Sequence, residues 1–236
     1  MIAPVKHNEP LERRESPRDR NRIVRADHLA ESCRTLLRKL PWKGNDLDTP
    51  LTAIGLTSCH TGEGVTTIAR ELSETAAATG EHKILLADFN FNTEHNFTTD
   101  RSRPNLGVAD VLLRNASWKD AVVNTDVPGL SYMPAGHLRD NANDAIDARC
   151  LPDLIEELKT KFDLVIADLP PAGEVSSVLR IGRLLDGLVI VVESEKTRRE
   201  VVARLKSQLD CARINMLGVV LNRRHQHLPN WLYNLF

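Results

Sequence analysis

Short runs of uninterrupted apolar residues constrain the fold of this chain most strongly. Leu164–Ala167 and Leu188–Val192 contain no polar side chain. A β-strand that is covered on both faces has this pattern, because both of its side-chain rows are buried. From Leu51 onward, amphipathic segments alternate with such runs, as they do when helices cover both faces of a parallel sheet. The sequence therefore predicts a three-layer α/β/α fold around a mostly parallel, doubly wound sheet.

The same patterns assign boundaries to the elements. Apolar runs predict strands over 52–58, 83–88, 130–134, 164–168, 187–193 and 217–222. Apolar residues at helical spacing predict helices over 65–78, 108–113, 151–162, 176–185 and 197–212. A further helix is expected just before Pro41, because proline ends a helical pattern.

Composition limits the classes of function. A chain of 236 residues that is 42% hydrophobic can bury one sizeable core. Its formal net charge of −1 argues against a nucleic-acid partner held by bulk electrostatics. No apolar run approaches the ~20 residues of a spanning helix, and the N-terminus lacks the apolar segment of a signal peptide. The four cysteines form no CxxC pair, so we expect a cytoplasmic globular protein without a zinc cluster or disulfide scaffold.

The two ends of the chain differ from its middle. Residues 1–26 hold seven basic and four acidic side chains, a net charge of +3, which predicts a disordered tail or, alternatively, a docking arm. Order is expected to begin near Asp27, with one domain over 27–222. The tail 223–236 carries several large apolar residues, which either dock on their own domain or contact a partner or membrane surface.

A stretch around residues 55–69 runs from a predicted strand through a glycine-bearing turn into a predicted helix. Phosphate loops of the form GxxxxGK[ST] occur in this context. Gly64 and Thr66 occupy the second glycine and the hydroxyl positions, whereas Val65 replaces the lysine. Backbone N–H groups at a helix start can still bind phosphate, but valine supplies no cation. The candidate nucleotide-binding residues are Thr61, Gly62, Glu63, Gly64, Val65, Thr66 and Thr67.

Two aspartates complete this candidate site. Asp88 and Asp168 each end an apolar run, and ligands of open parallel sheets bind at the carboxyl ends of strands. Together with the Thr66 hydroxyl, the two carboxylates suit Mg²⁺ and the activation of an attacking group. Each aspartate taken alone would usually be a helix cap or a turn residue. Beside the phosphate loop, we expect both to be catalytic and metal-binding residues.

Seven motifs occur in a fixed order along the chain. They are ESCRTL at 31–36, TSCHTGEGVTT at 57–67, LLADFN at 85–90, LGVADVL at 106–112, GLSYMPAG at 129–136, DLVIADLPP at 163–171 and GVVLN at 218–222. This ordered set resembles the cytoplasmic domain of bacterial tyrosine kinases of capsule and exopolysaccharide synthesis. These kinases lie within the MinD/ParA-like P-loop ATPases that have a deviant Walker motif.

The resemblance implies further roles for individual residues. It implies a P-loop NTPase fold that binds ATP or ADP with Mg²⁺, with Asn222 approaching the adenine. Relatives use the first helix between subunits, so Glu31, Arg34 and Arg38 are candidate oligomer contacts; a solvated helix face is the alternative. The C-terminal tail of such kinases is autophosphorylated, which makes Tyr233 a possible phosphoacceptor.

The departures from the family pattern decide between functions. Val65 replaces the loop lysine, Asn90 replaces a second acidic residue, and Tyr233 is the one tyrosine after residue 132. We therefore expect a regulatory or scaffolding component of polysaccharide biosynthesis or export with weak or no ATP turnover. An active tyrosine kinase with a relocated cation, from Arg70, Lys196, Arg198 or another subunit, is the alternative. A MinD/ParA-like positioning ATPase is the second alternative.

The resemblance also implies partners. Some relatives carry a membrane span on the same chain, which this sequence lacks. We expect a transmembrane polysaccharide co-polymerase or export protein to recruit the chain to the inner face of the plasma membrane, with a homo-oligomer possible and no nucleic acid.

Overall fold

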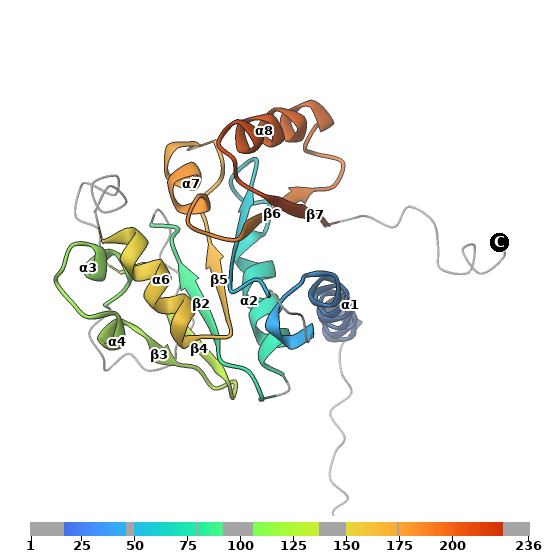
Figure 1. Cartoon of the computed structure of the whole chain (residues 1–236). Helices are drawn as coiled ribbons and strands as arrows, with labels where there is room; N and C mark the ends of the chain where they lie inside the picture. Colours follow the sequence, from blue (N-terminus) through green and yellow to red (C-terminus); the bar gives the residue numbers. More distant parts are fainter. Residues whose placement is uncertain are drawn as a thin grey trace, which may run out of the picture.

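A seven-stranded sheet forms the centre of the molecule. The computed structural model describes residues 17–45, 50–78, 80–91, 106–136, 150–173 and 175–223. The strands lie in the order β3-β4-β2-β5-β1-β6-β7, and all neighbours are parallel except the pair β3 and β4. Helices cover the sheet on both sides (Figure 1). The predicted α/β/α architecture is therefore confirmed.

The strands are β1 (Ala53–Ser58), β2 (Ile84–Asp88), β3 (Val123–Asn124), β4 (Leu130–Met133), β5 (Leu164–Asp168), β6 (Gly187–Glu193) and β7 (Met216–Asn222). The helices are α1 (Pro17–Lys39), the short 3₁₀ helix η1 (Lys43–Asn45), α2 (Val65–Ala77), α3 (Val108–Leu112), α4 (Trp118–Ala121), α6 (Leu151–Lys161), α7 (Val175–Gly182) and α8 (Arg199–Cys211). Within these ranges, no helix has the length and apolar character that crossing a bilayer requires.

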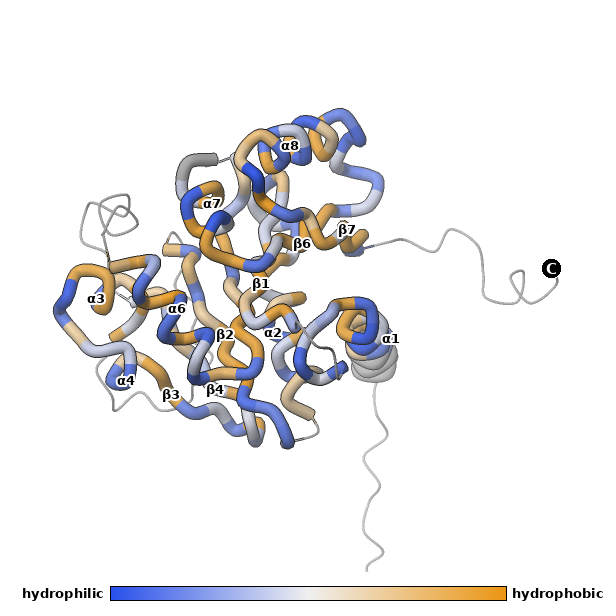
Figure 2. Tube along the Cα trace, viewed as in Figure 1, coloured by the Kyte–Doolittle hydropathy of each residue, from blue (hydrophilic) through white to orange (hydrophobic). Residues whose placement is uncertain are grey.

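Alternating side chains of the central strands fill two hydrophobic clusters, one on each face of the sheet. On β5, Val165 and Ala167 belong to the cluster that α6, α7 and α8 cover. The intervening Leu164 and Ile166 belong to the cluster that α1 and α2 cover. Apolar residues accordingly concentrate along the strands in Figure 2. Burial on both faces explains why these strands are apolar throughout.

Two parts of the fold differ from the expected elements. Helix α1 begins at Pro17, ten residues before the expected start of order at Asp27. Proline suits the first position of a helix, but the polar stretch after it has no apolar period that predicts a helix. Strand β3 and helix α4 were not predicted, because segments of two and four residues are too short to show a period. The domain boundaries remain predictions.

Candidate nucleotide site

The loop between β1 and α2 has the backbone shape of a helix-capping turn. Gly62 and Gly64 adopt positive φ angles of 84° and 97°, which only glycine adopts without strain. A side chain on Gly64 would also place its Cβ 2.2 Å from Nδ2 of Asn222. Gly64 is the N-cap of α2, and its carbonyl accepts from the amide of Ile68 at 3.1 Å. The first amides of α2 thus remain available to an anion at the loop.

The side chain of Glu63 fixes this loop to the carboxyl end of the neighbouring strand β6. Glu63 is 1% exposed. One carboxylate oxygen accepts from the amide of His60 at 2.8 Å, and the other accepts from the amide of Glu193 at 3.1 Å and from the Thr197 hydroxyl. Asn222 donates from Nδ2 to the Glu63 carbonyl at 2.8 Å. These bonds join the loop to the ends of β6 and β7 and to the start of α8.

The predicted carboxylates lie on neighbouring strands in the same register. Asp88 on β2 and Asp168 on β5 are Cα partners, and both are buried. The pKa of Asp88 is raised to about 8, chiefly by burial and secondly by the nearby Asp168, while hydrogen bonds from Asn90 and Tyr132 oppose the shift. Burial raises the pKa of Asp168 to about 6, while the Thr66 hydroxyl opposes the shift. The site therefore concentrates carboxylates that lack a balancing cation among the described residues.

These residues fit a divalent metal ion. Neither carboxylate oxygen of Asp168 meets the criteria for a hydrogen bond to another described residue, although the Thr66 hydroxyl lowers its pKa. A buried carboxylate without a partner is costly. Mg²⁺ commonly takes one or two carboxylates together with substrate phosphates, and here Thr66, Asp88 and Asp168 would hold it. When bound, Mg²⁺ would neutralise charge on the phosphates.

The side chain in the lysine position of the loop is buried in the core. Val65 is 8% exposed, and its side chain belongs to the cluster beneath α1 and α2. Of the cations considered as substitutes, Arg70 pairs with Glu74 at 2.7 Å and Lys196 with Glu193 at 3.0 Å. Arg198 is the exposed residue that precedes α8.

The remaining predicted residues lie in three places. Thr61 and Thr67 are exposed at the loop and on the first turn of α2. Glu31 and Arg34 form an exposed ion pair at 2.8 Å on α1, and Arg38 is exposed on the same helix, away from the carboxylates. Tyr233 lies outside the described residues. The oligomer contact and the phosphoacceptor remain predictions.

Two contributions to the site were missed by reasoning from the sequence. Tyr132 is buried on β4, and its hydroxyl donates to Oδ2 of Asp88 at 3.4 Å. It falls within the GLSYMPAG motif at 129–136, which was the available signal. Glu63 was predicted as a residue of the phosphate loop, but no role was predicted for its side-chain carboxylate. Its two distant partners are Glu193 at the end of β6 and Thr197 just before α8, which no local motif reveals.

Comparison with known proteins identifies the family. The family model described as "Cellulose biosynthesis protein BcsQ" matches residues 51–231. The chain belongs to the BcsQ family. This match spans the loop, both aspartates and Asn222, so the BcsQ-family domain contains the whole candidate site.

Relatives of this BcsQ-family chain include a tyrosine-protein kinase and a succinoglycan biosynthesis transport protein. Tyrosine-protein kinase CpsD of Streptococcus agalactiae is 27% identical over 75% of this chain and 78% of its own length. Succinoglycan biosynthesis transport protein ExoP of Rhizobium meliloti is 28% identical over 72% of this chain, which covers 22% of ExoP.

Solved structures confirm the fold of this BcsQ-family chain. The VpsO kinase domain has a TM-score of 0.75 at 25% identity and covers 87% of this chain and 98% of that one. MinD from Pyrococcus horikoshii OT3, solved with Mg-ADP, has a TM-score of 0.59 at 24% identity. The match covers 77% of this chain and 75% of the MinD chain. The chain thus has a MinD-like P-loop α/β fold and has relatives named as tyrosine-protein kinases.

Proposed function

We propose that the protein is a nucleotide-binding regulatory or scaffolding component of bacterial polysaccharide biosynthesis or export, with little or no ATP turnover. One observation carries the proposal: the residue in the lysine position, Val65, is packed into the core, while the phosphate loop and both carboxylates are kept. Backbone amides and carboxylates with Mg²⁺ are sufficient to hold a nucleotide.

The missing cation affects turnover more than binding. In phosphoryl transfer, a cation neutralises charge that develops on the transferred group, and a transition-state arginine contributes about 10³–10⁵ in rate. The loop supplies no such charge at position 65. We therefore expect the nucleotide to act as a ligand that fixes one conformation rather than as a substrate that is consumed.

The relatives support a membrane-bound partner. ExoP is named as a transport protein, and this chain matches only part of its length. We propose that the chain works on the cytoplasmic side of the membrane beside a transmembrane polysaccharide co-polymerase or export protein. Self-association through Glu31, Arg34 and Arg38 on α1 is part of this proposal.

Titration with Mg-ADP and Mg-ATP, followed by a turnover assay, tests the proposed function. We expect wild-type protein to bind both nucleotides with background turnover, and Val65→Lys to raise turnover by at least about 100-fold, because lysine restores part of the lost stabilisation. Val65→Met is the control, since it adds a long side chain without charge. Wild-type turnover that disappears in Asp88→Ala would contradict the proposal, and absent nucleotide binding would restrict the role to scaffolding.

An active kinase with a relocated cation is a second candidate. Arg223 and Lys196 both pair with Glu193, at 3.2 and 3.0 Å, and the Glu193 amide donates to the loop residue Glu63. Both cations are thus connected to the phosphate loop through Glu193. This function predicts turnover that is lost in Arg223→Ala or Lys196→Ala, together with phosphate on Tyr233 detected by mass spectrometry.

A further inference from the structure

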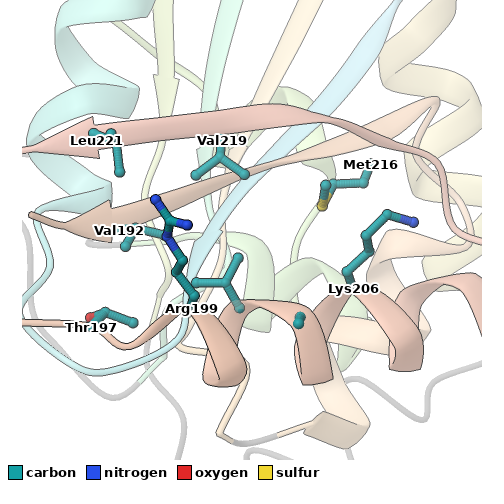
Figure 3. A pocket seen from close by; sticks show the side chains of 9 residues that line it. Val192, Thr197, Arg199, Lys206, Met216, Val219 and Leu221 are labelled. Atoms are coloured by element: carbon teal, nitrogen blue, oxygen red, sulfur yellow. The ribbon is translucent and has the colours of Figure 1, made fainter.

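An apolar groove lies between the last strand and the last helix of the described chain. It has a volume of about 360 Å³. Its apolar lining comes from Val192 on β6, Val202 on α8, and Met216, Val219 and Leu221 on β7. Figure 3 shows the labelled apolar side chains of β6 and β7 on the side of the strands that faces α8, with Arg199 reaching from the helix towards the strands. The groove lies on the opposite side of the sheet from α2 and its capping turn.

The strand that lines this groove has unusual exposure. β7 is the edge of the sheet, and Leu221 and Val219 are 63% and 42% exposed. On the opposite face of β7, Leu217 and Val220 pack against the cluster beneath α1 and α2. Exposed apolar side chains on an edge strand favour association, and a continuous apolar surface commonly marks a binding site. The groove therefore requires an occupant.

The chain itself supplies a suitable occupant beside the groove. Leu221 is followed after one residue by Arg223, whose φ of 54° bends the backbone at the end of β7. The thirteen residues that follow contain six large apolar side chains, namely Leu228, Trp231, Leu232, Tyr233, Leu235 and Phe236. The family match continues through residue 231, so it includes the first part of this segment, with Leu228 and Trp231.

We propose that residues 224–236 fold back over β7 and dock their apolar side chains in this groove within the same molecule. An extended segment of this length spans up to about 43 Å, more than the roughly 23 Å of the seven-residue β7. Only four residues separate Arg223 from Leu228. Such a short connection gives a high effective concentration, which favours docking in the same molecule over docking in a second one. Arg199 on α8 can form cation–π interactions with the aromatic side chains of the segment.

Hydrogen–deuterium exchange of the full chain tests the docking. We expect the amides of 228–236 to exchange at least tenfold more slowly than in a synthetic peptide of 224–236. The variant Leu221→Lys should remove this protection, because it places a charge in the apolar lining. Leu113→Lys is the matched control, since Leu113 is 42% exposed on the other side of the molecule, at the end of α3. Circular dichroism verifies that both variants are folded.

Three outcomes overturn the proposal. The first is exchange in 228–236 as fast as in the free peptide. The second is protection that Leu221→Lys and Leu113→Lys leave equally intact. The third is protection that disappears on dilution together with a dimer measured by light scattering, which shows docking in a second copy. Slow exchange in a monomer that is lost only in Leu221→Lys supports the docking.

Discussion

At the scale of single residues, Glu63 shows how one side chain determines the shape of a loop. Its carboxylate accepts hydrogen bonds from two backbone amides and one hydroxyl: the His60 amide lies in the same loop, whereas the Glu193 amide and the Thr197 hydroxyl come from distant segments. Glycines at 62 and 64 permit the turn, but they do not select one conformation from the many that glycine allows. The buried carboxylate makes that selection, because unbonded amides in its place would be costly.

Glu63→Gln tests this role. The amide group of glutamine places a donor opposite one of the amides of His60 or Glu193, so one buried donor loses its acceptor. We expect the free energy of unfolding to fall by about 1–3 kcal/mol, with faster amide exchange over 59–64. Urea denaturation and hydrogen exchange measure the two effects. Glu74→Gln, on an exposed ion pair of α2, should leave both within error; equal effects of the two variants would refute the role of Glu63.

At the scale of elements, the strands follow from the sequence wherever burial covers both faces. β5 and β6 have the predicted bounds, because their apolar runs stop at Asp168 and Glu193. The start of α1 could not be predicted, since its first six residues, PRDRNR, are polar apart from the proline and have no apolar period, so only the backbone reveals the helix. Asp88 and Asp168 were predictable from their place at strand ends, whereas Tyr132 lies inside a strand and approaches Asp88 only through sheet register.

One carboxylate joins the starts of two central strands. Asp186 accepts from the amides of Thr52 and Ala53 at 2.6 and 2.8 Å, and pairs with Lys159 at 3.1 Å. Burial alone would raise the pKa of Asp186, but the amides of Ala53 and Thr52 and the ammonium of Lys159 outweigh it and hold the pKa below its usual value. The ionised form therefore stabilises the contact between β1 and the loop before β6.

The effect of Asp186→Asn should depend on pH. Because the folded-state pKa is lowered, the stabilisation is complete above the unfolded value near 4 and is lost as pH falls through the folded value. We expect the variant to lose about 1–3 kcal/mol at pH 7, and the difference from wild type to shrink towards pH 3. Urea denaturation at several pH values measures it. Asp210→Asn, on an exposed pair with Lys206, is the control, and a difference that grows towards pH 3 would contradict the assignment.

At the scale of the whole molecule, one sheet serves both hydrophobic clusters. Leu158 on α6 is fully buried in one cluster and Leu72 on α2 in the other. The central strands between them contribute alternate side chains to both clusters. Loss of the packing on one face would therefore disrupt the sheet that the other cluster packs against. The molecule should therefore unfold as a unit.

Leu158→Ala and Leu72→Ala test this coupling. Each should lower the free energy of unfolding by about 2–5 kcal/mol, and both should shift the same transition. Trp42 reports on one face and Trp118 on the other, so fluorescence of single-tryptophan variants should give coincident urea curves. Leu113→Ala is the exposed control, with an expected change below about 1 kcal/mol. Separate transitions for the two tryptophans would show that the faces unfold independently.

The sheet order has a consequence for the time course of synthesis. β1 pairs with β5 and β6, which leave the ribosome more than 100 residues after it. The capping turn that follows β1 receives its bonds to Glu193, Thr197 and Asn222 later still. Contacts so distant along the chain form slowly. A nascent chain that stops before Glu193 therefore carries every phosphate-loop residue but lacks all three of these later partners, so we expect an ordered ligand-binding loop only when translation of the domain is almost complete.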